Sequence, residues 1–195
     1  MTPESPVHHR TPHPNRLAWI GLGGNLTRSP DLCEEAVQRL AQLVGMRLVA
    51  QSPFYQTQPF GPVLNQPWFI NAVLIVETTW GSHALLRRLA RIEASLGRNR
   101  QHEIRWGPRC LDLDLLFHGN RRIHTPSLIL PHPRLHLRRF VLQPLRDVSP
   151  TWIHPVYGKT IDTLLQEVED KCQITPWPGR RLETIHQAAT HYPVG

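Results

Sequence analysis

The feature that most constrains this chain is the alternation of leucine and aspartate in the segment 111–117, which reads LDLDLLF. Successive side chains of a β-strand point to opposite faces, so the segment predicts a strand that carries Asp112 and Asp114 on one face. Leu111, Leu113 and Leu115 then point to the other face, where we expect them to join an apolar core. The chain must therefore build a sheet with one apolar face and one face that carries acids.

Three further β-prone segments precede this strand. Leu17–Ile20 is a short apolar run that leads into a glycine turn at Gly21–Asn25. Met46–Tyr55 alternates roughly, and Phe69–Thr78 is the strongest strand signal in the chain.

Two helices are predicted between the strands. Ser29 is expected to cap the first, with apolar residues at helical spacing up to a stop at Gly45. Ser82 is expected to cap the second, which Gly97 ends. The resulting order β-α-β-β-α-β is the ferredoxin-like arrangement. We therefore predict an α+β fold with an antiparallel sheet and helices packed on it.

Smaller elements follow this core. The sequence predicts a hairpin around Gly119-Asn120, a helix over Leu137–Leu145 and a last short helix over Ile161–Val168. They complete the expected fold as a C-terminal hairpin with short helices.

The ends of the chain differ from its middle in composition. Residues 1–16 are polar and rich in proline, so we expect a disordered arm without a secretory signal. Residues 17–169 form the expected folded domain, and residues 170–195 are expected to be an irregular tail.

Charge and cysteine content narrow the class of protein. The chain has 22 Lys+Arg against 15 Asp+Glu, a net charge of +7, which suits anionic partners such as nucleic acid, acidic lipid or nucleotide phosphates. Three scattered cysteines, Cys33, Cys110 and Cys172, fit neither a disulfide framework nor a zinc knuckle, which favours a reducing cytoplasm. The apolar runs are far shorter than the ~20 residues that span a bilayer.

The acid pair has two interpretations. Adjacent carboxylates repel each other and lose hydration unless a positive charge lies between them. Oxygen ligands at the spacing of Asp112 and Asp114 suit Mg²⁺, which is usually held by one or two carboxylates together with substrate phosphates. The alternative is a solvated pair at the edge of a sheet.

A cluster of arginines directly precedes the acids. Arg98, Arg100, Arg105 and Arg109 lie in one polar loop with Trp106 among them. Arginines beside metal-binding acids suit phosphoryl transfer, because they balance the charge that spreads over the transferred group. An exposed basic loop that serves solubility or grips nucleic acid is the competing interpretation.

The segment 105–115, RWGPRCLDLDL, resembles the signature of the 6-hydroxymethyl-7,8-dihydropterin pyrophosphokinases of folate synthesis. The resemblance extends over roughly residues 17–168 and makes residues 17–169 a pyrophosphokinase domain. Further segments agree in order: Gly21–Leu26, Phe54–Thr57 with Gly61-Pro62, Phe69–Ala72, and Pro131–Pro133 with Arg138 and Phe140.

The resemblance implies a Mg²⁺-dependent diphosphotransferase. Such an enzyme transfers pyrophosphate from ATP to the hydroxymethyl oxygen of the pterin and releases AMP. Asp112 and Asp114 are then the ligands of two Mg²⁺ ions that bind with ATP, and Arg98 and Arg109 clamp the phosphates. The other nucleotide contacts that the resemblance implies are Glu93, Arg100, Trp106, His132 and Arg138.

The same resemblance implies a pterin site. Phe69 and Phe140 form the stacking pair, Asn71 reads the ring edge, and Trp106 closes over the ligand. For any single phenylalanine, plain core packing is the alternative. The residues implied to bind the pterin are Thr57, Gln58, Phe60, Gly61, Phe69, Asn71, Trp106 and Phe140.

The sequence departs from the family pattern at a few positions. Gly24 replaces the usual serine of the glycine turn, Gln101 stands where some members carry lysine, and Phe69 lacks the hydroxyl of members with tyrosine. The loop 98–109 is also one residue longer. None of these changes removes an expected metal ligand or a main arginine.

Two other classes remain open from the residues alone. A basic ferredoxin-like domain can bind RNA, although no aromatic strand of the RNA-recognition type is present. Twelve histidines can indicate metal storage, although they follow no ligand spacing. With the resemblance, the expected partners are ATP and the pterin, without nucleic acid or membrane, and the expected state is a cytoplasmic monomer.

Overall fold

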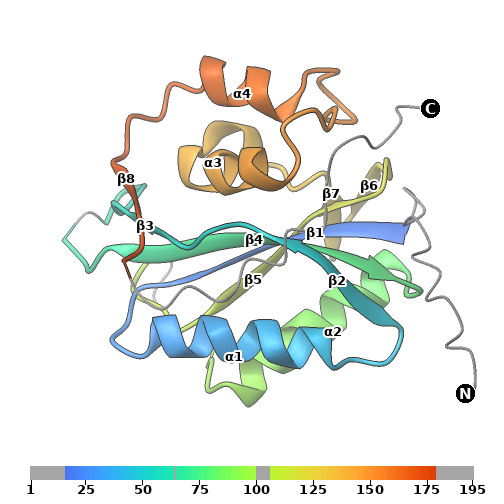
Figure 1. Cartoon of the computed structure of the whole chain (residues 1–195), viewed down its shortest axis with the longest axis horizontal. Coiled ribbons are helices and arrows are strands. Elements are labelled where there is room, and N and C mark those ends of the chain that lie inside the picture. The colour runs from blue at the N-terminus through green and yellow to red at the C-terminus, as the bar shows by residue number, and fades with distance from the viewer. Residues whose placement is uncertain (1–15, 64, 100–105, 179–195) are drawn as a thin grey trace, which may run out of the picture.

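A six-stranded sheet separates two pairs of helices in the computed structural model, which describes residues 16–63, 65–99 and 106–178 (Figure 1). The elements, in chain order, are β1 (Leu17–Gly24), α1 (Ser29–Ala41), β2 (Met46–Gln51), β3 (Tyr55–Thr57), β4 (Phe69–Thr78), α2 (Ser82–Ser95), β5 (Asp112–His118), β6 (Ile123–Thr125), β7 (Leu128–Leu130), a 3-10 turn (Leu135–Leu137), α3 (Arg139–Val148), α4 (Ile161–Glu167) and β8 (Ile174–Pro176).

The sheet confirms the predicted ferredoxin-like α+β class. Its order is β5-β1-β4-β3-β8, β2 also pairs with β4, and all of these pairs are antiparallel. The segment that the sequence predicted as one strand is divided into β2 and β3. Between them, Ser52 exchanges hydrogen bonds with the backbone of Val73, so the chain stays attached to β4 across the break.

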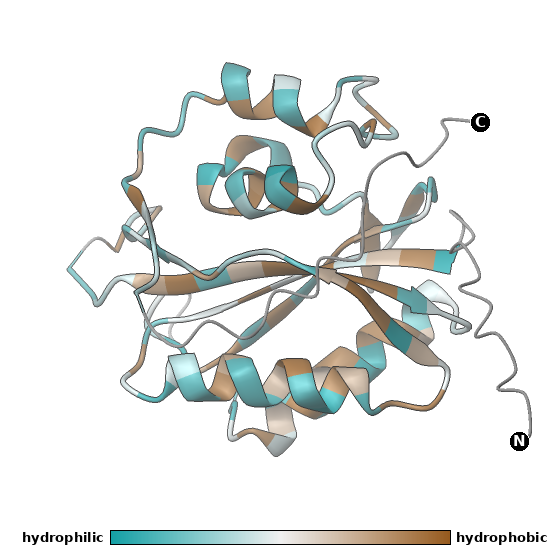
Figure 2. Cartoon of the chain, in the orientation of Figure 1, coloured by the Kyte–Doolittle hydropathy of each residue, from teal (hydrophilic) through white to brown (hydrophobic). Residues whose placement is uncertain are grey.

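The two faces of the sheet bury two separate apolar clusters. On β1, Ala18 and Ile20 point toward α1 and α2, whereas Leu17 and Trp19 point toward α3 and α4. Leu113 on β5 lies in the first cluster, as the alternation predicted. Figure 2 shows the apolar colour concentrated along the strands of the sheet and more polar colour on the helices and loops.

The predicted serine caps are wrong. Arg28 and Gly81 occupy the cap positions of α1 and α2, and neither helix has a side-chain cap. Ser29 instead donates its hydroxyl to the carbonyl oxygen of Cys110 at 2.7 Å, and the Ser82 hydroxyl lies 2.9 Å from Nδ1 of His118. In both cases a partner distant in the sequence replaces the local one.

The C-terminal part differs from its prediction in two places. The hairpin β6–β7 turns at Pro126-Ser127 rather than around Gly119-Asn120. Residues after 169 were expected to be irregular, but Ile174–Pro176 forms β8 beside β3.

The expected arm, 1–16, lies outside the described residues except for Arg16. Among the helices that the structure describes, each is too short or too polar to cross a bilayer.

Candidate active site

A cavity of about 420 Å³ opens on the α3 side of the sheet, over β1, β4 and β5. Its floor is hollow because β1 carries glycine there. Gly23 pairs with Asn71 on one side and Asp112 on the other, and Gly21 pairs with Asp114. The glycines therefore leave the space between the acids of β5 and the amide of β4 free of side chains.

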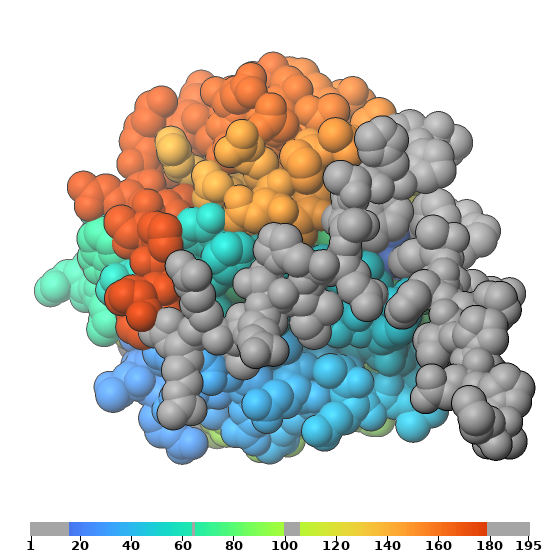
Figure 3. Space-filling model, in the orientation of Figure 1, coloured from blue at the N-terminus to red at the C-terminus, as the bar shows by residue number. Residues whose placement is uncertain are grey.

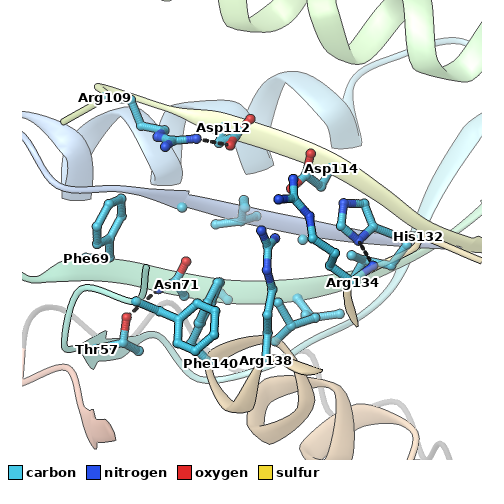
Figure 4. Close-up of a pocket in the computed structure, with 18 of the residues that line it drawn as sticks. Thr57, Phe69, Asn71, Arg109, Asp112, Asp114, His132, Arg134, Arg138 and Phe140 are labelled. Carbon is cyan, nitrogen blue, oxygen red and sulfur yellow. Dashed lines mark hydrogen bonds and ion pairs between the residues drawn. The ribbon is translucent and has the colours of Figure 1, made fainter. Parts of the chain in front are cut away.

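Asp112 lies between two arginines at one end of the cavity. Its Oδ1 accepts a hydrogen bond from Nη1 of Arg98, and its Oδ2 accepts one from Nη1 of Arg109 at 2.9 Å (Figure 4). Burial raises the pKa of this carboxyl, but the two guanidinium groups outweigh that effect and hold the pKa below its ordinary value. Asp112 therefore remains ionised.

Glu93 lies behind this pair, in the last turn of α2, and is 1% exposed. Its Oε1 accepts hydrogen bonds from Nη1 of Arg98 and, at 2.7 Å, from the backbone N–H of Leu113. It does not line the cavity. The geometry makes Glu93 a support for Arg98 and for β5, and the nucleotide contact that the resemblance implies for it stays a prediction.

Asp114 has a different environment from its neighbour on the strand. Burial, and then the negative charge of Asp112, raise its pKa to about 7, and the positive charge of Arg138 opposes this only in part. The positive charges of the described residues therefore do not compensate for the burial of Asp114 and for the charge of Asp112 beside it. A divalent cation supplies further positive charge, so the acid pair fits Mg²⁺ held jointly with substrate phosphates. Within the described residues, no cluster of three or more metal-ligating side chains exists.

A basic wall faces the acids across the cavity. His132, Arg134 and Arg138 come from the segment between β7 and α3, and all three line the cavity (Figure 4). Burial, together with the charges of Arg138 and Arg134, lowers the pKa of His132 to about 4, so its imidazole is neutral. Arg134 was not identified from the sequence. The run of basic residues that follows Pro133 is the signal that could have found it.

The other end of the cavity is aromatic and amide-lined. Nδ2 of Asn71 donates to Oγ1 of Thr57 at 2.6 Å, and both side chains are buried. Phe69 on β4 and Phe140 at the start of α3 lie at the same end (Figure 4). The ring of Phe60 lies 6.3 Å from that of Phe140, measured between centroids. A flat polar heterocycle fits this combination of rings and edge-on hydrogen-bonding groups.

Trp106 forms part of the cavity rim. The guanidinium of Arg134 lies 4.7 Å from the centre of its ring, within cation–π distance. Gly61 has a φ of 116°, and a Cβ atom there would lie 3.3 Å from the Trp106 ring. Gln66 donates to the backbone oxygen of Trp106 at 3.0 Å and also accepts from Asn25, which fixes the rim to the glycine turn.

The structure brings most of the sequence-predicted residues into this one cavity. Two do not line it: Glu93 supports Arg98 from behind, and Gly61 packs against Trp106. Arg100, and Gln101 beside it, lie outside the described residues. The sequence-predicted residues that line the cavity are Thr57, Gln58, Phe60, Phe69, Asn71, Arg98, Trp106, Arg109, Asp112, Asp114, His132, Arg138 and Phe140.

Paired acids beside several arginines in one cavity are the groups that phosphoryl transfer uses, so the site is that of a transferase of the kinase type. Residues 19–150 match the model of the 7,8-dihydro-6-hydroxymethylpterin-pyrophosphokinase (HPPK) family. This chain belongs to that family, the pyrophosphokinases of folate synthesis.

Individual relatives agree with the family model. The chain is 38% identical over 182 residues to the 2-amino-4-hydroxy-6-hydroxymethyldihydropteridine pyrophosphokinase of Synechocystis, covering 93% of this chain and 90% of that one. It is 40% identical over 153 residues to the enzyme of the same name from Haemophilus influenzae, covering 78% and 93%.

Solved structures show the same fold. The Plasmodium falciparum HPPK-DHPS crystal structure with pteroate superposes with a TM-score of 0.62 at 17% identity. That match covers 77% of this chain and 42% of the longer Plasmodium chain, so it concerns one part of that protein.

Proposed function

We propose that the cavity binds ATP, Mg²⁺ and 6-hydroxymethyl-7,8-dihydropterin together, and that the pyrophosphokinase reaction takes place between its acidic and aromatic ends. The observation that carries this proposal is that the acid pair, the arginines and the aromatic, amide-lined end share one cavity of about 420 Å³. The reaction moves the pyrophosphoryl group of ATP to the hydroxymethyl oxygen of the pterin, giving AMP and the pterin diphosphate.

Asp112 and Asp114 are the proposed ligands of two Mg²⁺ ions. The raised pKa of Asp114 supports this role, because a cation that binds there relieves the repulsion between the two carboxylates. When bound, Mg²⁺ neutralises phosphate charge and acidifies a hydroxyl that is held beside it. Asp112 already has its two oxygens directed by Arg98 and Arg109, so this carboxylate is oriented before the substrates arrive.

The arginines of the cavity are the proposed phosphate clamps. Arg98 and Arg109 reach the acidic end, and Arg138 reaches across from the basic wall. Guanidinium groups on two sides can hold the transferred group while negative charge redistributes over its oxygens. Nδ1 of His132 accepts the backbone N–H of Arg134 at 3.3 Å, so Nε2 of the neutral ring carries the proton and can donate one hydrogen bond without adding charge.

The aromatic end is the proposed pterin site. Phe69 and Phe140 offer ring faces, while Asn71, Thr57 and the backbone near Gln58 offer hydrogen bonds to the ring edge. Because Asn71 and Thr57 are already joined at 2.6 Å, the amide is fixed in orientation before the ligand binds.

We also propose that the enzyme acts as a cytoplasmic monomer. A single copy of the chain supplies the acid pair, the arginines and the aromatic rings that the proposed reaction uses, so the site needs no residue from a second copy. The cysteines Cys33, Cys110 and Cys172 are all free, which supports a reducing compartment.

The test is an assay of the purified chain with ATP, MgCl₂ and 6-hydroxymethyl-7,8-dihydropterin, with nucleotide products separated by chromatography. We expect AMP to form in equal amount to the pterin diphosphate, and only when both Mg²⁺ and the pterin are present. ADP as the product would indicate an ordinary kinase. Tight RNA binding in the absence of Mg²⁺, with no AMP formed, would favour a nucleic-acid-binding protein instead.

A further inference from the structure

We propose that the segment 170–177 is a strap that positions both walls of the aromatic end of the cavity, with Asp170 as its positioning residue. The inference rests on the proposed function, since it concerns how the pterin end of that site is held in place. The residues of the strap lie beyond those that match the family model, 19–150.

The first attachment is to the strand that leads into the pterin end. β8 pairs with β3 in antiparallel register, from Tyr55 opposite Pro176 to Thr57 opposite Ile174. The backbone N–H of Gln58 donates to the oxygen of Gln173 at 3.0 Å, and that of Trp177 donates to the oxygen of Phe54 at 2.8 Å. Figure 1 shows the chain descending from α4 past α3 to run beside β3.

This attachment matters because β3 is very short. It has three residues and pairs with β4 on its other side over the same three residues. Without β8 it becomes the exposed edge of the sheet, where a short strand with unpaired backbone groups opens readily. Thr57, at its end, accepts the hydrogen bond that orients Asn71, and Gln58 follows directly in the cavity wall.

The second attachment is to the start of α3. Asp170 is 8% exposed, and its Oδ2 accepts the backbone N–H of Arg139 at 2.8 Å. Its Oδ1 accepts the N–H of Cys172 at 2.8 Å, which turns the chain toward β8. The residue at the cap position of α3, Arg138, provides no side-chain cap, so Asp170 satisfies a free N–H of the helix from 31 residues away.

The strap thus joins two walls that are distant in sequence. Arg139 lies between Arg138 and Phe140, both of which line the cavity, while β8 holds Thr57 and Gln58 in the adjoining wall. Figure 3 shows this end of the described chain on the surface, between the helices α3 and α4 above and α1 below. The strap touches the walls of the cavity and not the cavity itself, which makes its role positional.

The experiment separates the two attachments. A chain that ends at residue 172 keeps Asp170 and removes β8, and Thr175→Pro in the full chain breaks the ladder. Thr175 lies opposite Gln56, midway between the hydrogen bonds that join Gln58 to Gln173 and Trp177 to Phe54. Because hydrogen-bonded and non-hydrogen-bonded pairs alternate along an antiparallel ladder, Thr175 is at a hydrogen-bonded position, where proline removes the donor. For both variants we expect the KM for the pterin to rise about tenfold and the KM for ATP to change less than twofold.

Asp170→Ala tests the second attachment. Because it frees the start of α3, which carries both Arg138 and Phe140, we expect the KM values for ATP and pterin to rise together, with a smaller rise for Asp170→Asn. The controls are a chain that ends at residue 178, which keeps the whole strap, and Asp162→Asn on α4. Both are expected to match the full chain.

Amide hydrogen exchange gives a readout that is independent of activity. The N–H groups of Gln58 and Arg139 should exchange slowly in the full chain, and that of Gln58 should exchange much faster in the chain that ends at 172. The proposed role of the strap is wrong if the amide exchange is unchanged, or if the pterin KM of both β8 variants stays within twofold of the value for the full chain. If the full chain itself forms no AMP, the proposed function fails, and the exchange rates still decide whether the strap holds these walls.

Discussion

The Cα atom of Gly23 lies directly beside the side chain of Asn71, so that a Cβ atom at position 23 would be 2.3 Å from Oδ1 of Asn71. Real Cβ atoms do not approach an oxygen so closely. Glycine at this position therefore leaves room for the amide of Asn71, which donates to Thr57.

This contact predicts a selective effect of Gly23→Ala. The added methyl group should displace Asn71 and raise the KM for the pterin by about tenfold, with less change in the KM for ATP. Gly81→Ala is the control, because Gly81 does not line the cavity and a Cβ there would meet no atom within 4 Å. Steady-state kinetics of both variants test the prediction, and equal effects on the two KM values at position 23 would contradict it.

The acid pair predicts unequal effects on stability. Asp112 is joined to Arg98 and Arg109, so Asp112→Ala removes a partner from the buried guanidinium of Arg98 and from the half-buried one of Arg109, and should cost about 1–3 kcal/mol of unfolding free energy. Asp114→Asn removes a carboxylate that its neighbour repels, and should leave the unfolding free energy unchanged or slightly higher. Urea unfolding in Mg²⁺-free buffer measures both.

Turnover should respond differently from stability. If both acids hold Mg²⁺, the two variants should each lose nearly all AMP formation, even though only Asp112→Ala is destabilised. Near-parent turnover by either variant would remove that residue from the proposed metal site.

Buried histidines predict that the protein is less stable in mild acid. Burial is the main cause that lowers the pKa values of His118, His132 and His154 to about 4. Between the folded value and the ordinary value of 6.5, the unfolded chain binds protons that the folded chain does not, so unfolding free energy falls as the pH falls through this window. Each histidine contributes up to about 1.4 kcal/mol per pH unit.

The titration of Asp114 changes the unfolding free energy with pH in the opposite direction. Its pKa of about 7 means that the folded chain holds a proton that the unfolded chain has already lost above pH 3.8, so its contribution to stability is lost as the pH rises. His118→Gln should therefore flatten the dependence of unfolding free energy on pH between 4.5 and 6.5, and Asp114→Asn should steepen it. Denaturant titrations at three pH values check both slopes, and identical slopes in the two variants would be inconsistent with these assignments.

Arg134 predicts a specific effect on the nucleotide. It lies on the basic wall beside His132 and is exposed, so its loss should not unfold the chain. We expect Arg134→Gln to weaken Mg²⁺-dependent ATP binding roughly fivefold and to leave pterin binding within twofold. Calorimetric titration with an unreactive ATP analogue measures this, and Arg122→Gln, outside the cavity, is the control.

The sequence predicted the order of the elements and the orientation of the acids because both depend on periodicity within a single segment. Asp112 and Asp114 share the cavity, and Leu113 lies in the core on the other side, as alternation along one strand requires. The same alternation cannot show that, among the residues that the structure describes, Asp112 is paired with arginines and Asp114 is not.

The errors concern partners that are distant along the chain. Ser29 and Ser82 have the right residue type and position for helix caps, but hydrogen bonds to Cys110 and His118 occupy their hydroxyl groups. Nothing in the sequence around Glu93 indicates that its carboxylate accepts a hydrogen bond from the backbone of Leu113. Ile174–Pro176 lacks the periodicity of a strand because its three residues form one only by pairing with β3.

The two faces of β5 also have a consequence for how the gene can vary. Asp112 and Asp114 alternate with Leu113 and Leu115, so a single inserted or deleted codon within this strand would move acids into the apolar cluster and leucines into the cavity. Such a change would damage folding and chemistry in one event. The turn at Pro126-Ser127 joins a hairpin outside the main sheet, so length variation there leaves the register of β5 unchanged. Natural insertions should therefore accumulate at that turn and be absent from β5.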